Sequence, residues 1–422
     1  MTFGTIAVVG LGYIGLPTAA VFASRKRRVI GIDVNTHAVE TINRGEVHIV
    51  EPDLDMLVHA AVTEGYLRAT TVAEPADAFL IAVPTPFKTD HKPDLSYIES
   101  ASKAVAAVLK AGDLVILEST SPVGATEQMA AWLAEARPDL TFPQTAGEAS
   151  DIRIAHCPER VLPGHVLSEL VHNDRVIGGM TPRCSEVATS LYKIFVEGEC
   201  VITNARTAEM CKLTENSFRD VNIAFANELS MVCDKLDVDV WELIRLANRH
   251  PRVNILQPGP GVGGHCIAVD PWFIVSQAPE QSRLIRTARE VNDSKPAWVL
   301  AKVRSHIDDL IASTGKTRNS IRIACLGLAF KANIDDLRES PALAITAAIA
   351  QEFPGQVVAV EPHIDAVPAN LRQADVQLVD MTEALFADVL VLLVDHKYLT
   401  AQPLRLRANQ RLLDTRGALQ LL

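Results

Sequence analysis

The β-α-β pattern at the amino-terminal end constrains the fold of this chain more than any other feature. A β-branched run, "TIAVV" at 5–9, leads through "GLGYIGLP" into a helix-compatible segment, and a second strand-like run, "RVIGID", follows at 28–33. Gly10, Gly12 and Gly15 have G-x-G-x-x-G spacing at the first turn. The first two glycines let the backbone turn and approach a pyrophosphate, and the third allows close helix packing. The pattern predicts a Rossmann-like dinucleotide-binding domain.

Asp33 ends the second strand, where a ribose-binding acid belongs. Its carboxylate would repel a 2′-phosphate, so we expect NAD as the cofactor and not its phosphorylated form. Tyr13 and Ile14 lie between the glycines and join the predicted cofactor-binding residues. The alternative, a purely structural glycine turn, is disfavoured by the flanking strand and helix.

Two more strand-like runs, at 78–86 and 113–124, end in Thr, Ser, Pro and Gly. Ligands of an open parallel sheet meet the carboxyl ends of its strands. Thr85, Ser119 and Thr120 are therefore candidates for hydrogen bonds to the cofactor or substrate. Alternatively, these hydroxyls cap the following helices.

From residue 199 to residue 250 the chain has neither Gly nor Pro, which predicts long helices. Lys212, Asn216 and Asp220 recur there at four-residue intervals, so they share one helix face. Bulky apolar residues surround that face and predict a largely buried helix, in which a Lys needs a partner or a task. The alternative is a solvated polar stripe.

A second β-α-β pattern follows "STGKTRNS" and begins with "IRIACLGLAF", in which Gly327 is the one remaining glycine of a dinucleotide fingerprint. We expect an α/β protein with two Rossmann-like doubly wound domains joined by a long-helix central domain. The expected boundaries are 1–198 for the NAD-binding domain, 199–300 for the central helical domain and 318–422 for the carboxyl-terminal domain, which would hold something other than a dinucleotide.

Cys266 stands behind a glycine-rich loop in "GVGGHCIAVD" and precedes Asp270 by four residues. A thiolate can attack an aldehyde to give a thiohemiacetal, and loss of hydride to NAD then gives a thioester that water cleaves to an acid. A Lys ammonium and an Asn amide can stabilise the oxyanion, and a carboxylate can position or activate water. The alternative is that Cys266 is a small packing residue.

Composition excludes several classes of protein. The seven cysteines are scattered without a C-x-x-C pair, which argues against a disulfide framework or a zinc site and favours a reducing, cytoplasmic location. We expect no bound metal. A formal net charge of -11 argues against nucleic-acid binding. No uninterrupted apolar run is long enough for membrane insertion.

Six motifs in order, "GLGYIGLP", "STSPVG", "CPER", "EMCKLTEN", "GVGGHCIAVDP" and "FKANIDDLRESP", closely resemble the UDP-glucose/GDP-mannose dehydrogenase family over nearly the whole chain. Within the family, the chain looks most like bacterial enzymes that oxidise carbon 6 of UDP-N-acetyl-D-mannosamine with NAD for surface polysaccharide of the enterobacterial common antigen type. The resemblance also implies a homodimer or a dimer of dimers. UDP-glucose and UDP-N-acetylglucosamine remain alternative substrates.

Carried over residue by residue, the resemblance implies that Cys266 is the nucleophile and Lys212 the oxyanion-stabilising cation. Asn216 would hold the reacting oxygen, and Asp270 would orient Lys212 or water.

The resemblance also implies roles outside that group. Glu159 would assist thioester hydrolysis, and Thr120 would position the water. Arg252 would reach the substrate of a neighbouring subunit. Lys331 and Arg338 would contact the substrate or close over the cofactor, unless they pair with Asp335, Asp336 or Glu339. The implied substrate-binding residues are Glu159, Arg160, Lys212, Asn216, Arg252, Gly263, His265, Lys331 and Arg338.

Two rival functions make different demands on the same residues. A two-electron dehydrogenase of the β-hydroxyacid type shares the amino-terminal fold but has no use for a thioester-forming Cys266. A non-catalytic NAD sensor has no need of an oxyanion stabiliser beside a thiol.

Overall fold

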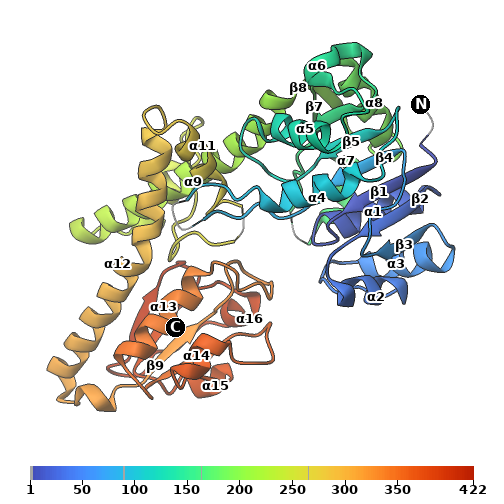
Figure 1. The fold of residues 1–422 in the computed structure, drawn as a ribbon. Coiled ribbons are helices and arrows are strands. Elements are labelled where there is room, and N and C mark those ends of the chain that lie inside the picture. Colours follow the sequence, from blue (N-terminus) through green and yellow to red (C-terminus); the bar gives the residue numbers. More distant parts are fainter. Residues whose placement is uncertain (1–2, 89–90, 163, 265) are drawn as a thin grey trace. The chain divides into compact units, whose positions relative to one another are not determined.

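The computed structural model describes residues 3–88, 91–162, 164–264 and 266–422. The chain forms two compact units (Figure 1). One comprises Met1–Glu215 and Trp272–Gln277, and the other comprises Asn216–Pro271 and Ala278–Leu422. Within the described ranges, no helix has the length and apolar character needed to cross a membrane.

The strands form two sheets. The first sheet contains β1 (Thr5–Val9), β2 (Arg28–Ile32), β3 (Leu67–Thr70), β4 (Ala78–Ile81), β5 (Leu114–Leu117), β6 (Arg153–His156), β7 (Arg175–Gly179) and β8 (Cys200–Asn204). The second contains β9 (Ile323–Leu326), β10 (Val357–Val360), β11 (Gln377–Leu378), β12 (Val389–Leu392) and β13 (Arg411–Asp414).

Helices connect these strands. Those of the first half are α1 (Gly15–Ser24), α2 (Thr36–Asn43), α3 (Leu54–Thr63), α4 (Ser96–Ala106), α5 (Ala125–Ala136), α6 (Pro143–Ala146), the 3₁₀ helix η1 (Gly147–Ala149), α7 (Val166–His172) and α8 (Pro182–Tyr192). Those of the second half are α9 (Ala205–Leu236), α10 (Val240–Ala247), α11 (Asp270–Gln277), α12 (Arg283–Thr314), the 3₁₀ helix η2 (Arg318–Ser320), α13 (Pro341–Glu352), α14 (Ala369–Gln373), α15 (Met381–Ala384) and α16 (Lys397–Thr400).

The first sheet has the order β3-β2-β1-β4-β5-β6-β7-β8, and all its pairs are parallel except β6 with β7. Successive side chains of β1 enter two cores: Ile6 and Val8 belong to one, and Ala7 and Val9 to the other. The sheet is therefore packed on both faces, as the apolar strands require. The direction of the crossovers reverses between β1 and β4, which is where ligands of doubly wound folds bind.

The second sheet repeats this plan on a smaller scale, with the order β11-β10-β9-β12-β13 and parallel pairing throughout. Ile323 and Cys325 of β9 face one core, while Ala324 and Leu326 face the other. The predicted fold class, two Rossmann-like domains with long helices between them, is confirmed.

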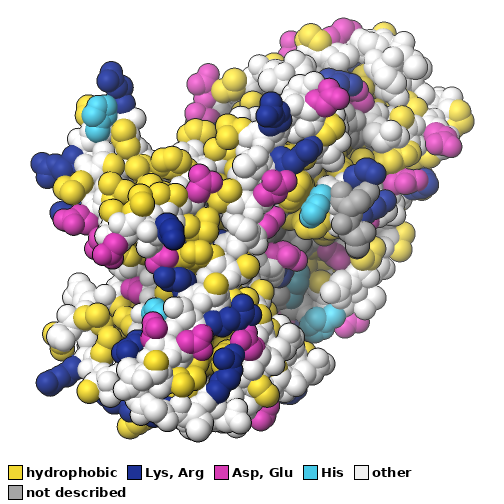
Figure 2. Space-filling view, turned by 90° about the vertical axis from the view of Figure 1, so that its left-hand side faces the viewer, with side chains coloured by type: hydrophobic (Ala, Val, Ile, Leu, Met, Phe, Trp, Pro, Cys, Tyr) yellow, Lys and Arg dark blue, Asp and Glu magenta, His cyan; other side chains and the backbone are white. Residues whose placement is uncertain are grey.

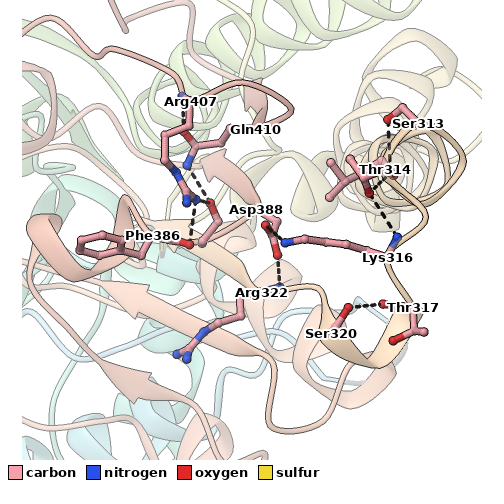
Figure 3. A network of polar contacts seen from close by, with 12 residues as sticks. Ser313, Thr314, Lys316, Thr317, Ser320, Arg322, Phe386, Asp388, Arg407 and Gln410 are labelled. Atoms are coloured by element: carbon pink, nitrogen blue, oxygen red, sulfur yellow. Dashed lines mark hydrogen bonds and ion pairs between the residues drawn. The ribbon is translucent and has the colours of Figure 1, made fainter.

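The end of α12 is fastened to the second sheet by a polar network (Figure 3). Gly315 ends the helix with a left-handed φ of 71°. Beyond it, Lys316 Nζ lies 2.6 Å from Asp388 Oδ1, and Asp388 Oδ2 accepts a hydrogen bond from the Arg322 N–H at 3.0 Å. Asp388 therefore links Arg322, the residue before β9, to Lys316 at the end of α12.

Two expectations for residues 199–250 were wrong. Residues 200–204 form the edge strand β8 and not a helix, because the β-branched run Val201, Ile202 and Thr203 pairs with β7. The helix α9 is also less buried than predicted: the side chains of Phe218 and Phe225 are 70% and 56% exposed. Those two rings point away from the buried helix face that contacts α12.

Candidate active site

The glycine turn after β1 has the geometry of a dinucleotide site. Gly10 has a φ of 90°, and a Cβ there would lie 2.7 Å from the Ala82 carbonyl oxygen. A Cβ on Gly15 would collide with the Gly10 carbonyl, whereas a Cβ on Gly12 would meet nothing within 4 Å. Gly10 and Gly15 are thus required by packing, and Gly12 faces the space that a pyrophosphate would use.

Asp33 lies directly beside this turn. Its Oδ2 accepts from the Leu11 N–H at 2.8 Å, and its Oδ1 accepts from the Asn35 N–H at 2.8 Å. Two backbone donors therefore fix a partly exposed carboxylate at the end of β2, as the ribose of NAD requires. Ile14 precedes α1, and the half-buried Tyr13 packs against the core beneath the turn.

The hydroxyls predicted at the next strand ends differ in their bonding. Ser119 donates to the Val83 carbonyl at 2.6 Å, which ties the loops after β5 and β4 together. The Thr85 hydroxyl is buried without a hydrogen-bond partner among the described residues, so it is the better candidate for a ligand contact. Thr120 is half-buried on the same loop as Ser119.

Glu159 follows β6 and lies in a buried charged cluster. Its Oε1 accepts from the Arg160 N–H at 2.6 Å, and its Oε2 lies 2.9 Å from Arg175 Nη1. The Arg175 guanidinium lies over the ring of Tyr192, 4.9 Å from its centroid, and the Tyr192 hydroxyl donates to Glu118 Oε1 at 2.6 Å. Two carboxylates thus share the surroundings of one guanidinium.

Glu118, Arg175 and Tyr192 were not predicted from the sequence. Burial raises the pKa of Glu118 to about 7; the Glu159 carboxylate acts in the same direction, and the Arg175 charge opposes it. A carboxyl with that pKa near a predicted catalytic acid is typical of functional sites. The one signal in the sequence is an acid at the end of an otherwise apolar strand, "LVILE".

The structure brings together two predicted catalytic residues at the start of α11. Asn216 on α9 donates from Nδ2 to Asp270 Oδ2 at 2.5 Å, and both side chains are buried. The Asp270 N–H donates to the Cys266 carbonyl at 2.8 Å, so Cys266 lies one turn before Asp270. Cys266 is exposed, whereas burial raises the pKa of Cys157 and Cys325 to about 12 and keeps those thiols protonated.

The glycines before Cys266 have a packing reason. A Cβ on Gly263 would collide with the Glu339 carbonyl, and a Cβ on Gly264 would lie 2.8 Å from the Phe330 ring. The Gly264 N–H also donates to the Arg338 carbonyl at 3.2 Å. The loop at 327–340 therefore packs on the segment that leads to Cys266.

The other predicted substrate residues lie on three different elements. Lys212 is half-buried on α9, one turn before Asn216. Arg160 forms an ion pair with Glu215, with Nη2 2.7 Å from Oε1. Arg252 is exposed in the turn after α10.

The remaining predictions concern Lys331, Arg338 and His265. Lys331 is exposed on the loop at 327–340. On the same loop, Arg338 forms a two-pronged contact with Asp336, 2.6 Å between Nη2 and Oδ2, which is the pairing that the alternative interpretation expected. His265 lies outside the described residues.

In the second sheet, the acid at the position that corresponds to Asp33 is buried and fully engaged. Glu361 follows β10, is buried, and accepts from the Leu328 and Ala329 N–H groups at 2.7 and 3.0 Å. Its Oε2 also lies 3.0 Å from Nε2 of the buried His396, whose Nδ1 lies 2.9 Å from the Asn333 nitrogen. With its acid engaged in this way, the second turn lacks the exposed carboxylate that the first presents to a ribose.

A glycine turn and acid of this kind at the switch point of the first sheet define an NAD-binding Rossmann domain. Models of the UDP-glucose/GDP-mannose dehydrogenase family match the chain in three parts: the NAD binding domain at 4–196, the central domain at 206–294 and the UDP binding domain at 324–421. The chain belongs to this family, and NAD is its cofactor.

Relatives of known name span the full length of the chain. UDP-N-acetyl-D-mannosamine dehydrogenase of Yersinia pestis is 67% identical over 418 residues, which cover 99% of each chain. NDP-N-acetyl-D-galactosaminuronic acid dehydrogenase of Ralstonia solanacearum is 66% identical over 416 residues, 98% of this chain and 96% of that protein. The solved structure of UDP-D-ManNAc dehydrogenase from Pyrococcus horikoshii has a TM-score of 0.86 and 38% identity, covering 99% of this chain and 96% of the other.

Proposed function

We propose that this enzyme oxidises carbon 6 of UDP-N-acetyl-D-mannosamine to a carboxylate in two successive NAD-dependent steps. The observation that carries the proposal is the pair of Asn216 and Asp270 at the helix start that follows the exposed Cys266. An amide held by a buried carboxylate presents a fixed donor, and a thiol nearby supplies a nucleophile. The near-identical length and high identity of the Yersinia pestis relative support this substrate.

Each protein group has a task in this scheme. When bound, NAD would supply the oxidant: the carbon 6 alcohol and then the thiohemiacetal would each pass one hydride to a separate NAD molecule. The Cys266 thiolate attacks the aldehyde carbon to form a thiohemiacetal, whose oxyanion Lys212 and Asn216 stabilise. Loss of the second hydride leaves a thioester on Cys266. Water then adds to the thioester carbonyl, the C–S bond breaks, and the carboxylate and the thiol are released.

Glu159 and Thr120 belong to the hydrolytic step in this proposal. Glu159 would take a proton from the attacking water, and Thr120 would hold that water by its hydroxyl. Asp270 would orient the Asn216 amide through their hydrogen bond.

The Ralstonia solanacearum relative favours a second candidate substrate. At 66% identity it is almost as similar as the Yersinia pestis enzyme, yet its name specifies an N-acetylgalactosamine-type sugar. Discrimination between these sugars depends on a few polar contacts at the ring, so we keep the N-acetylgalactosamine nucleotide beside UDP-N-acetyl-D-mannosamine.

Further parts of the proposal concern the setting of the reaction. We infer that the enzyme works in the cytoplasm as a homodimer or a dimer of dimers and supplies a uronic acid for bacterial surface polysaccharide. We also infer a division of labour among residues 1–198, 199–300 and 318–422, in which the last part binds the UDP-sugar through Lys331 and Arg338.

The experiment measures NADH formed per limiting molecule of nucleotide sugar, with the purified enzyme, Cys266→Ser and the matched control Cys200→Ser. We expect about two NADH per sugar for the wild type and the control, and loss of this stoichiometry in Cys266→Ser. A ratio of about one, unaffected by Cys266→Ser, would discard the thioester mechanism. A panel with the nucleotides of glucose, N-acetylglucosamine, N-acetylgalactosamine and N-acetylmannosamine identifies the sugar.

A further inference from the structure

A buried chain of polar side chains connects α9, α12 and the glycine-rich segment before Cys266. Asp220 and Asn227 on α9 are each 0% exposed, and Arg289 and Asn292 on α12 are each 1% exposed. Burying four polar side chains is costly unless they are hydrogen-bonded to one another or to the backbone. The hydrogen bonds of these side chains therefore show which group each of them holds in place.

The hydrogen bonds that link these four side chains to one another and to the loop all donate toward Asp220. Arg289 Nη1 donates to Asp220 Oδ1 at 2.6 Å, and Asn292 Nδ2 donates to the same oxygen at 2.8 Å. Asn227 Nδ2 donates to Asn292 Oδ1 at 2.8 Å. Finally, the Gly259 N–H donates to Asn227 Oδ1 at 2.8 Å.

This direction has a physical consequence. An ionised carboxylate only accepts hydrogen bonds, so Asp220 fixes the orientation of the Asn292 amide. The Asn292 oxygen then faces Asn227 and fixes its amide in turn. The Asn227 oxygen is left facing the loop, where it holds the backbone N–H of Gly259.

Gly259 is held from its other side as well. A Cβ on Gly259 would lie 2.5 Å from Arg416 Nη1, and that nitrogen donates to the Pro258 carbonyl at 3.4 Å. The far end of the same segment is Asp270, which accepts from Asn216. Asn216 and Asn227 are eleven residues apart on α9, about three turns, so they lie on one face of the helix.

We propose that Asn227 is a positioning residue of the Cys266 segment: it anchors the backbone at Gly259, while Asn216 anchors the other end at Asp270. Asn292 and Asp220 act through Asn227 by setting its amide orientation. The inference rests on the proposed role of Cys266 as nucleophile. A loop held at both ends by one helix keeps its thiol in place for attack, and a displacement of about 1 Å can lower a rate about 100-fold.

The test compares Asn227→Ala with Asn222→Ala, a matched control on the same helix whose amide donates within α9 to the Phe218 carbonyl. For Asn227→Ala we expect kcat for NADH formation to fall about 10- to 100-fold with the KM for NAD unchanged, and Asn222→Ala to match the wild type. We also expect a changed rate of iodoacetamide alkylation at Cys266, followed by peptide mass spectrometry. Asn227→Ala leaves the buried Asn292 oxygen and the Gly259 N–H unpaired, so its thermal unfolding transition should fall in either case. A purely structural role would leave kcat and the alkylation rate at their wild-type values below that transition.

A double-mutant cycle tests the relay itself. If Asn292 acts through Asn227, Asn292→Ala lowers kcat in the wild-type background but costs nothing further in Asn227→Ala. Independent, additive losses, or wild-type kcat and alkylation rate in both single variants, would overturn the proposal. Alkylation at Cys266 needs no sugar, so a change there remains readable even if the enzyme fails to oxidise every nucleotide tried, which would refute the proposed function alone.

Discussion

At the scale of single residues, Glu118 is a carboxyl buried in surroundings unlike water. It is 1% exposed, accepts from the Tyr192 hydroxyl at 2.6 Å and has a pKa raised to about 7 by burial, reinforced by Glu159 and opposed by Arg175. Its proton therefore stays bound in the folded chain at pH values where the unfolded chain has released it. Between its unfolded pKa and about 7, folding must retain a proton, and the stability of the fold falls as pH rises.

Glu118→Gln removes this titration but keeps the oxygen that Tyr192 uses. The stability of the variant relative to wild type should rise between about pH 4.5 and about pH 7, by up to roughly 3 kcal/mol in the free energy of unfolding. Urea denaturation at several pH values measures this difference. Glu127→Gln is the control, because the hydrogen bond to Arg206 lowers the pKa of the half-buried Glu127 and its titration ends below this range. A flat difference for Glu118→Gln would mean that Glu118 is ionised throughout.

At the scale of elements, the turn between β1 and α1 contains glycines with different tasks. Gly10 and Gly15 are required by packing, whereas Gly12 faces the space for the ligand. Gly12→Ala places a methyl group in open space, so we expect a normally folded protein. That methyl group would block the approach of the pyrophosphate and weaken NAD binding by at least about tenfold, or roughly 1.4 kcal/mol. Calorimetric titration with NAD measures the loss, and circular dichroism checks the fold.

Gly15→Ala is the matched comparison in the same turn. Its Cβ would collide with the Gly10 carbonyl, so α1 cannot keep its place against β1, and we expect a destabilised protein. If Gly12→Ala bound NAD like the wild type, the pyrophosphate would have to lie elsewhere than at this turn.

Local patterns predicted the elements that depend on local physics. The glycine spacing and the apolar strands indicated both Rossmann-like sheets, and the fold class is confirmed. The edge strand β8 was missed because the absence of Gly and Pro does not distinguish a β-branched strand from a helix, whereas its pairing with β7 does. A proline usually ends a helix, yet Pro296 lies inside α12.

The candidate site shows the same limit. Motif order placed Asn216 and Asp270 in one predicted set, and the structure joins them directly. The partners Tyr192 and Glu118 are 74 residues apart, and Asn227 and Asn292 are 65 apart. No spacing rule connects such pairs, because each contact is made by the packing of separate elements. The roles of the site residues stay predictions for the experiments above.

At the scale of the whole molecule, α9 presents a surface that is more apolar than an ordinary solvent-exposed surface. Phe218 and Phe225 on α9 are 70% and 56% exposed, and Leu236 at the end of the helix is 66% exposed. Hydrophobic side chains gather on the side of the molecule where α9 and α12 lie (Figure 2). An apolar face of this kind marks an interaction surface, and a second copy of the chain is the proposed occupant.

The double variant Phe218→Asp, Phe225→Asp should therefore be monomeric under conditions in which the wild type is a dimer, as measured by sedimentation velocity. Phe386→Asp is the matched control, since that ring is 69% exposed on the domain of the second sheet. If Arg252 reaches the substrate of a neighbouring subunit, the monomer should also lose turnover while it binds NAD as tightly as before. A monomeric variant with full turnover would confine the complete site to one chain and leave Arg252 without its proposed role, whereas a dimeric variant would place the interface elsewhere than on α9.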